Sequence, residues 1–213
     1  MLDQADEALS QRLASAPVVP LIAEDDPARA LDVALAVKSG GLTVLEVVLR
    51  GDNALAGLEA IRNAGGDLIV GAGTVLTLDH YHAAREAGAQ FIVSPGLLDP
   101  LVEAALADNL PILPGAMTAS DVQRAYALGV RSVKFFPASL AGGVSMLKAF
   151  GSVFREMRFM PTGGISASNL AEYLALPHVL ACGGSWLTPN GAEPTVIEAL
   201  AREALAIAND VRG

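Results

Sequence analysis

Short runs of apolar, β-branched residues recur along the chain about every 20 to 25 residues, and each is followed by a longer stretch with helical spacing. This alternation is typical of βα units, whose strands lie parallel under a cover of helices. Residues 3–14, ahead of the first strand, are expected to form an extra amphipathic helix that covers the bottom of the fold. The pattern predicts strands at Pro17–Ile22, Thr43–Val48, Leu68–Val70, Phe91–Val93, Pro111–Leu113, Ser132–Phe135, Arg158–Met160 and Val179–Cys182.

An open doubly wound sheet produces a similar alternation, so repetition alone does not establish that the strands close into a barrel. The glycine pattern favours the barrel. Gly71-Ala72-Gly73-Thr74 is expected as a turn after the third strand, but Leu76 stands where a dinucleotide-binding turn carries its third glycine. The prediction is an α/β fold in which residues 1–213 form a single-domain (β/α)8 TIM barrel with an extra N-terminal helix.

The composition fits this fold and limits the partners. Of the 213 residues, 52% are hydrophobic and 17% are charged, which suits strands that are covered on both faces. A net charge of -9 without a cluster of Lys and Arg argues against nucleic acid. The acidic N-terminus lacks the apolar core of a signal peptide, and no apolar stretch is long enough to cross a membrane. With a single cysteine, Cys182, the chain is expected to be a soluble, cytoplasmic protein.

Glu46 and Arg50 carry charge in and just after an apolar strand. Successive strand residues point to opposite faces, so both share a face with Val48 and are expected to point into the barrel near its C-terminal mouth. Active sites of such barrels lie at this mouth. The alternative is a buried ion pair that only holds the top of the barrel together.

Lys134 stands within the sixth apolar run, where both faces of the strand should be covered. Inside the barrel its amine would be desolvated and close to Arg50, and both influences favour the neutral form, whereas Glu46 opposes them. A neutral lysine can attack a carbonyl and form an iminium. The alternative is a lysine whose charged end reaches solvent from the end of the strand.

Two glycine-rich turns are expected after the seventh and eighth strands, at 161–166 and 183–186. In barrels these loops often bind phosphate, because a backbone without side chains lets an anion approach its N–H groups. The turn at 71–74 would suit the carboxylate of a keto acid beside Arg50, and Pro95, Pro114 and Phe136 could form walls of the same pocket. No metal is expected, because His80 and His82 lie on different faces of a helix.

Eight segments together resemble the 2-dehydro-3-deoxy-phosphogluconate (KDPG) aldolase family, the class I aldolases of the Entner-Doudoroff pathway. The resemblance spans nearly the whole chain. The segments are PVVPLI (17–22), LEVVLR (45–50), VGAGTVL (70–76), FIVSPG (91–96), PGAMT (114–118), VKFFPA (133–138), PTGGIS (161–166) and GGSWL (183–187).

The resemblance implies an enzyme, a lyase that cleaves 2-dehydro-3-deoxy-6-phosphogluconate to pyruvate and glyceraldehyde 3-phosphate. It further implies a homotrimer without metal or cofactor, whose only other partner is the small phosphorylated keto acid. In this sequence the implied roles are these: Lys134 forms the Schiff base, Glu46 accepts and donates protons, Arg50 and Thr74 hold the pyruvyl carboxylate, Thr162 contacts the aldehyde half, and Gly163, Gly164, Gly184 and Ser185 hold the phosphate.

One position departs from the family pattern, because Val48 stands where the pattern has threonine. The lost hydroxyl bears on substrate preference, so the same chemistry on 2-dehydro-3-deoxy-6-phosphogalactonate or 4-hydroxy-2-oxoglutarate is an alternative. A phosphosugar isomerase or epimerase barrel, with Glu46 moving a proton, is a second alternative. A phosphometabolite-binding protein without turnover is a third.

Overall fold

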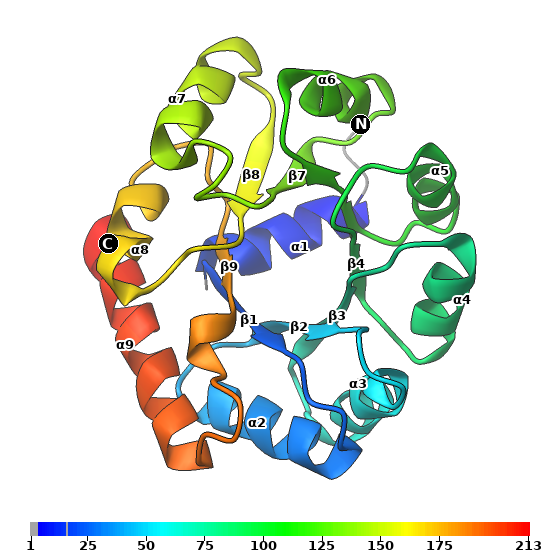
Figure 1. Cartoon of the computed structure of the whole chain (residues 1–213), viewed down its shortest axis with the longest axis vertical. Helices are drawn as coiled ribbons and strands as arrows, with labels where there is room; N and C mark the ends of the chain where they lie inside the picture. The colour runs from blue at the N-terminus through cyan, green and yellow to red at the C-terminus, as the bar shows by residue number, and fades with distance from the viewer. Residues whose placement is uncertain (1–3, 16) are drawn as a thin grey trace.

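The computed structural model describes residues 4–15 and 17–213 as a ring of short parallel strands inside a ring of helices (Figure 1). No helix in this described part is long and apolar enough to cross a membrane. The helices are α1 (Gln4–Ser15), α2 (Pro27–Ser39), α3 (Ala54–Ala64), α4 (Leu78–Glu86), α5 (Asp99–Ala107), α6 (Ala119–Ala127), α7 (Gly143–Val153), α8 (Ala167–Leu174), the 3-10 turn η1 (Ser185–Leu187) and α9 (Pro194–Arg212). The strands are β1 (Val18–Ile22), β2 (Val44–Val48), β3 (Ile69–Gly73), β4 (Phe91–Val93), β5 (Ile112–Leu113), β6 (Gly115–Ala116), β7 (Ser132–Phe135), β8 (Arg158–Pro161) and β9 (Cys182–Gly184).

The strands form two parallel sheets that together close the barrel. One has the order β5-β4-β3-β2-β1-β9 and the other the order β6-β7-β8. Two isolated bridges join the two sheets: one from Phe159 in β8 to Val179, which precedes β9, and one from Thr162, directly after β8, to Gly183 in β9. On the other side, β5 and β6 follow each other directly across Pro114, whose carbonyl accepts from the Lys134 N–H at 3.0 Å. The predicted barrel fold is thereby confirmed.

Three predicted strands differ from the observed ones by more than one end residue. The fifth is split, because β5 pairs with β4 whereas β6 pairs with β7, and Pro114 between them has no N–H for a ladder bond. The third extends to Gly73, so the predicted turn at 71–74 is wrong for its first three residues, which pair with β2 and β4. The eighth begins at Cys182 and contains Gly183 and Gly184, which were predicted as a turn.

The core has two layers, as the alternation of strand side chains requires. An outer layer between strands and helices contains Leu45 and Val47 of β2, whereas Val44 belongs to an inner cluster within the ring. Leu9 and Leu13 of α1 pack against that inner cluster, and α1 lies behind the strands in Figure 1. The predicted extra helix therefore covers one end of the barrel; residue 3, its predicted first residue, lies outside the described residues.

Candidate active site

Lys134 and Glu46 meet inside the barrel, although 88 residues separate them in the sequence. Lys134 lies on β7 and Glu46 on β2, two strands that are not neighbours in a sheet. Their exposed fractions are 6% and 0%. The Lys134 Nζ atom donates to Glu46 Oε1 at 3.1 Å. The structure therefore brings the two predicted catalytic side chains together as a buried ion pair.

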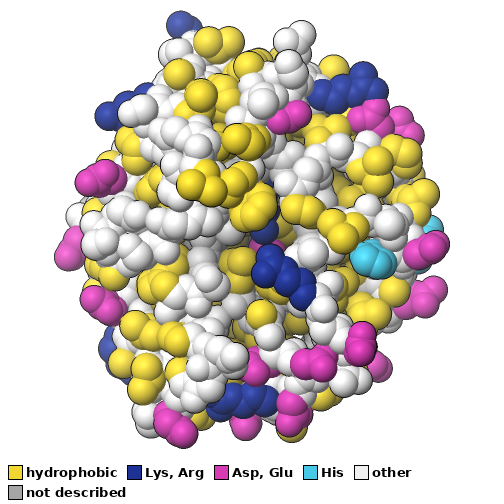
Figure 2. All heavy atoms as spheres, in the orientation of Figure 1, with side chains coloured by type: hydrophobic (Ala, Val, Ile, Leu, Met, Phe, Trp, Pro, Cys, Tyr) yellow, Lys and Arg dark blue, Asp and Glu magenta, His cyan; other side chains and the backbone are white. Residues whose placement is uncertain are grey.

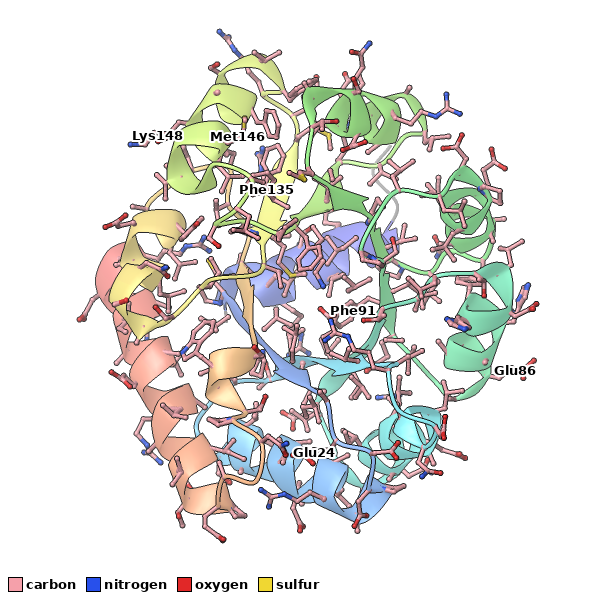
Figure 3. All side chains as sticks on the ribbon, in the orientation of Figure 1. Glu24, Glu86, Phe91, Phe135, Met146 and Lys148 are labelled. Carbon is pink, nitrogen blue, oxygen red and sulfur yellow. The ribbon has the colours of Figure 1, made fainter. Side chains whose placement is uncertain are left out.

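The strand alternation explains why both side chains point inward. Val44, two residues before Glu46, belongs to the inner cluster, and so does Met160, which pairs with Lys134 across β7 and β8. Their neighbours in sequence, such as Val133 and Phe135, belong to the outer layer. Phe135, labelled in Figure 3, contacts the α7 side chain of Phe150 at a ring separation of 5.9 Å. Each strand thus presents its charged residue to the interior and its apolar residues to the helices.

The pair leaves one carboxylate oxygen unengaged. Glu46 Oε2 is buried and has no hydrogen-bond partner among the described residues. A carboxylate accepts hydrogen bonds on both oxygens, and a buried acceptor without a partner is costly. On the lysine side, the Phe136 ring centroid lies 5.5 Å from Nζ. A charged pair with an unengaged oxygen is an unfavourable way to stabilise a fold, and it is a suitable acceptor for a substrate proton.

A cavity of about 150 Å³ lies one layer of side chains nearer the C-terminal ends of the strands. Val48 and Phe136, two residues beyond Glu46 and Lys134, line it, and so does Thr162, two residues beyond Met160. Because strand side chains repeat every two residues, the cavity lies directly above the ion pair. Its lining consists of Leu21, Ala23, Val48, Arg50, Phe136, Thr162, Gly163, Gly164, Ile165, Gly184 and Ser185.

Seven of the predicted substrate-binding residues therefore surround one cavity, which the sequence could only suggest: Arg50, Phe136, Thr162, Gly163, Gly164, Gly184 and Ser185. Arg50 is exposed and supplies a cation at the rim. Figure 2 shows Lys and Arg atoms at the centre of this face, over the middle of the ring, with apolar and uncharged surface around them. A small anionic molecule would meet a local positive charge there despite the net charge of -9.

The two glycine segments approach the cavity in different ways. Gly163 and Gly164 follow β8 with φ values of 95° and 78°, a left-handed backbone that glycine adopts without strain. Gly184 ends β9 and caps η1, which begins at Ser185. The loop after β7 is tied to the first segment, because Ser139 N donates to the Gly163 carbonyl at 3.0 Å. The cavity thus has bare backbone on one side, where the phosphate was predicted.

Thr74 and Pro95 are not among the residues that line this cavity. Thr74 directly follows β3 and has a φ of 61°, an unusual and strained conformation for a β-branched residue. Pro95 follows β4, and its carbonyl oxygen would lie 2.1 Å from a Cβ atom on Gly115. Both lie at the C-terminal ends of strands, as predicted, and their roles toward a ligand stay predictions.

Sequence reasoning missed three lining residues, Leu21, Ala23 and Ile165. They are apolar and carry no chemical signal, although the alternation along β1 could have indicated that Leu21 faces inward. Among the other candidates, burial raises the pKa of the Cys182 thiol, which leaves it a neutral core residue. No group of His, Cys, Asp and Glu in residues 4–15 and 17–213 has the geometry to hold a metal ion.

Comparison with known proteins identifies the family. A model of the family described as KDPG and KHG aldolase matches residues 9–199. The chain belongs to the KDPG and KHG aldolase family. The 2-dehydro-3-deoxy-phosphogluconate aldolase of Pseudomonas aeruginosa is 41% identical over 208 residues, which are 96% of this chain and 94% of that protein. The predicted family and the predicted enzyme class, an aldolase and hence a lyase, are confirmed.

Solved structures of KDPG aldolases have the same fold. The Zymomonas mobilis enzyme with 3-phosphoglycerate superimposes with a TM-score of 0.91 at 42% identity, over 95% of this chain and 97% of that one. The Legionella pneumophila enzyme, with pyruvate captured as a covalent carbinolamine, has a TM-score of 0.88 at 39% identity, over 92% of this chain and 97% of that one. A carbinolamine precedes a Schiff base, so the predicted class I chemistry is confirmed for the family.

Proposed function

We propose that this aldolase cleaves 2-dehydro-3-deoxy-6-phosphogluconate with Lys134 as the Schiff-base nucleophile and Glu46 as the proton acceptor and donor. The buried pair of Lys134 and Glu46, 3.1 Å apart beneath a cavity with bare glycine backbone, is the observation that carries the proposal. Transfer of the shared proton to Glu46 frees the lone pair of Nζ for attack on a carbonyl carbon.

The reaction begins when Lys134 Nζ adds to C2 of the substrate and a carbinolamine forms. Loss of water, with Glu46 supplying the proton, gives an iminium that draws electrons from the C3–C4 bond. Glu46 then accepts the proton of the C4 hydroxyl while the C3–C4 bond breaks, and glyceraldehyde 3-phosphate leaves. The remaining enamine takes a proton at C3, and water hydrolyses the iminium to pyruvate and free lysine.

The cavity residues suit the two ends of such a substrate. Arg50 is the cation at the rim, and with Thr74 it would hold the pyruvyl carboxylate. The backbone of Gly163, Gly164 and Gly184, with the Ser185 hydroxyl, would hold the phosphate. Thr162, buried at the cavity floor, would contact the hydroxyls of the aldehyde half, and Phe136 and Pro95 would form apolar walls. This proposal needs no cofactor and no metal ion.

A second substrate is 4-hydroxy-2-oxoglutarate, and the family description, which includes KHG aldolase, favours its inclusion. The apolar Val48 wall beside Arg50 also bears on this choice. If the glycine backbone binds phosphate, kcat/KM for the phosphorylated substrates should exceed that for 4-hydroxy-2-oxoglutarate, mainly through KM. Equal kcat/KM values would contradict the phosphate site while leaving the lysine chemistry intact. The phosphogalactonate substrate tests stereochemical preference in the same assay.

We further infer that residues 1–213 act as one domain in a cytoplasmic homotrimer. One ring of strands with one surrounding set of helices supports the single domain. The buried, unpaired Cys182 is compatible with a reducing compartment. Sedimentation of the purified protein should give three times the mass of 21.8 kDa. A monomer or dimer would contradict the trimer.

Borohydride trapping tests the nucleophile. Reduction in the presence of pyruvate should add about 72 Da to Lys134, the mass of pyruvate less one oxygen. The chain has only three lysines, so the peptide assignment is unambiguous. Lys148, which is exposed and points away from the barrel in Figure 3, supplies the matched control: Lys148→Ala should trap as the wild type, and Lys134→Ala should not. A label on Lys148, or turnover by Lys134→Ala, would overturn the proposal.

A further inference from the structure

Gly73, the last residue of β3, lies against the Glu46 carboxylate. A Cβ atom at Gly73 would stand 1.9 Å from Glu46 Oε1 and 2.5 Å from its Cδ. Atoms do not approach so closely without a bond, so a side chain at residue 73 and Glu46 in its present position exclude each other. We propose that Gly73 is a positioning residue: the space left by its missing side chain holds the Glu46 carboxylate in place beside Lys134.

The strand register explains how this space arises. Gly71 pairs with Glu46 and Gly73 pairs with Val48 across β3 and β2. Paired residues of neighbouring strands point to the same face, so both glycines leave room inside the barrel. The Phe91 ring fills the room at Gly71, where a Cβ atom would lie 2.2 Å from the ring, and Figure 3 shows Phe91 inside the ring of strands. The Glu46 carboxylate fills the room at Gly73, nearer the cavity.

The need for glycine at residue 73 is steric and does not come from the backbone. Gly73 is not among the residues with a left-handed φ, so alanine can adopt its backbone conformation. The atoms that a Cβ would meet belong to the end of a flexible side chain, which can rotate away. The fold can therefore accommodate the substitution by displacing the carboxylate from Nζ, and the cost should appear in proton transfer.

This inference rests on the proposed role of Glu46, and its expected effect follows from that role. A displacement of about 1 Å in a catalytic group commonly costs on the order of 100-fold in rate. Gly73→Ala should therefore lower kcat by about 10- to 100-fold, with little change in KM, because it replaces none of the residues that are proposed to bind substrate. The pH profile of kcat should also shift, because the Glu46 carboxylate moves away from the Lys134 ammonium, which now lies 3.1 Å from it.

The matched control is Gly71→Ala, on the same strand and the same face. It presses on the Phe91 ring, 2.2 Å from the added Cβ, and the three atoms nearest to that Cβ all belong to Phe91. We expect it to lower the melting temperature, while the folded enzyme keeps a kcat and a pH profile close to those of the wild type. If Gly71→Ala lowers kcat as much as Gly73→Ala, any disturbance of β3 suffices, and the positioning role is wrong.

A double-mutant cycle separates this inference from the proposed function. Glu46→Gln should lose about 100-fold or more in kcat, and adding Gly73→Ala should cost less than about twofold more, because no carboxylate remains to be misplaced. If the losses in kcat of the two single variants multiply in the double variant, the inference is wrong. A Gly73→Ala variant with the wild-type kcat would also overturn it. A Glu46→Gln variant with full activity would instead overturn the proposed function.

Folding of the variant has its own test. If Gly73→Ala is insoluble, the clash predicts that Glu46→Ala restores solubility in the double variant, because the atoms that the new Cβ meets are gone. A double variant that stays insoluble would show that the steric conflict lies elsewhere, and the inference would be wrong.

Discussion

Replacing Glu46 with leucine should leave the Lys134 ammonium buried beneath the cavity without its counter-charge. The two groups are 3.1 Å apart, and their side chains are 7% and 1% exposed. The converse change, Lys134→Met, leaves a buried carboxylate whose second oxygen already has no partner among the described residues. We predict that each single variant is far less stable than the double variant Glu46→Leu/Lys134→Met.

The magnitude follows from the distance. At 3.1 Å and an effective dielectric constant of about 20, the attraction is about 5 kcal/mol before desolvation is subtracted. Removing one partner of a buried pair commonly costs about 3 to 5 kcal/mol, whereas replacing both with apolar residues is neutral or stabilising. Because the free energy of unfolding of a typical domain is about 5 to 15 kcal/mol, each single variant should lose a large share of its stability.

Urea unfolding of the four proteins at pH 7 measures the coupling. The surface pair Lys38–Asp67, 2.6 Å apart with an exposed carboxylate, is the control, and its own cycle should give a much smaller coupling because water screens the charges. Added salt should weaken the control coupling and leave that of Lys134 and Glu46 nearly unchanged. Free energies that add within about 0.5 kcal/mol for the buried pair would refute the reasoning.

Three further predictions concern other parts of the barrel. Thr74→Gly should raise the free energy of unfolding by up to about 1 kcal/mol in thermal melts, because glycine adopts the left-handed backbone at φ 61° without strain. It should also raise KM in steady-state kinetics, because the hydroxyl is lost, and an unchanged KM would contradict a role of Thr74 in binding. Gly164→Ala should raise KM for phosphorylated substrates by about 10-fold or more and leave that for 4-hydroxy-2-oxoglutarate nearly unchanged, because only phosphate needs the backbone there. Desolvation raises the pKa of Asp121, but hydrogen bonds from the Met117 and Thr118 N–H groups and the Thr118 hydroxyl outweigh it, so the net pKa lies below its ordinary value. The ionised carboxylate therefore stabilises the fold at pH values above its ordinary pKa of about 4, and this stabilisation is lost as the pH falls through its lowered pKa. In urea unfolding, Asp121→Ala should lower the free energy of unfolding by about 1 kcal/mol at pH 7 and by less at pH 3.

Much of the barrel could be predicted because its signals are local. The alternation of Leu45, Glu46, Val47 and Val48 indicates which residues face inward, and a lysine in an apolar run stands out without any coordinates. The errors occurred where local signals mislead. Glycine is typical of turns, yet Gly71 and Gly183 lie within strands. They are glycines for a steric reason: Phe91 and Thr162 occupy the space that a side chain at residue 71 or 183 would fill.

The identity of the site residues was present in the chain, but their assembly was not. The strand pattern is enough to predict that Glu46 and Lys134 each point inward, because the direction of a strand side chain follows from its alternation with the adjacent residues. Their contact across 88 residues, and the position of the cavity one layer above them, depend on the closure and register of the ring, which no short segment encodes. Gly73 belongs to the same class, because its value to Glu46 arises from a pairing between two strands.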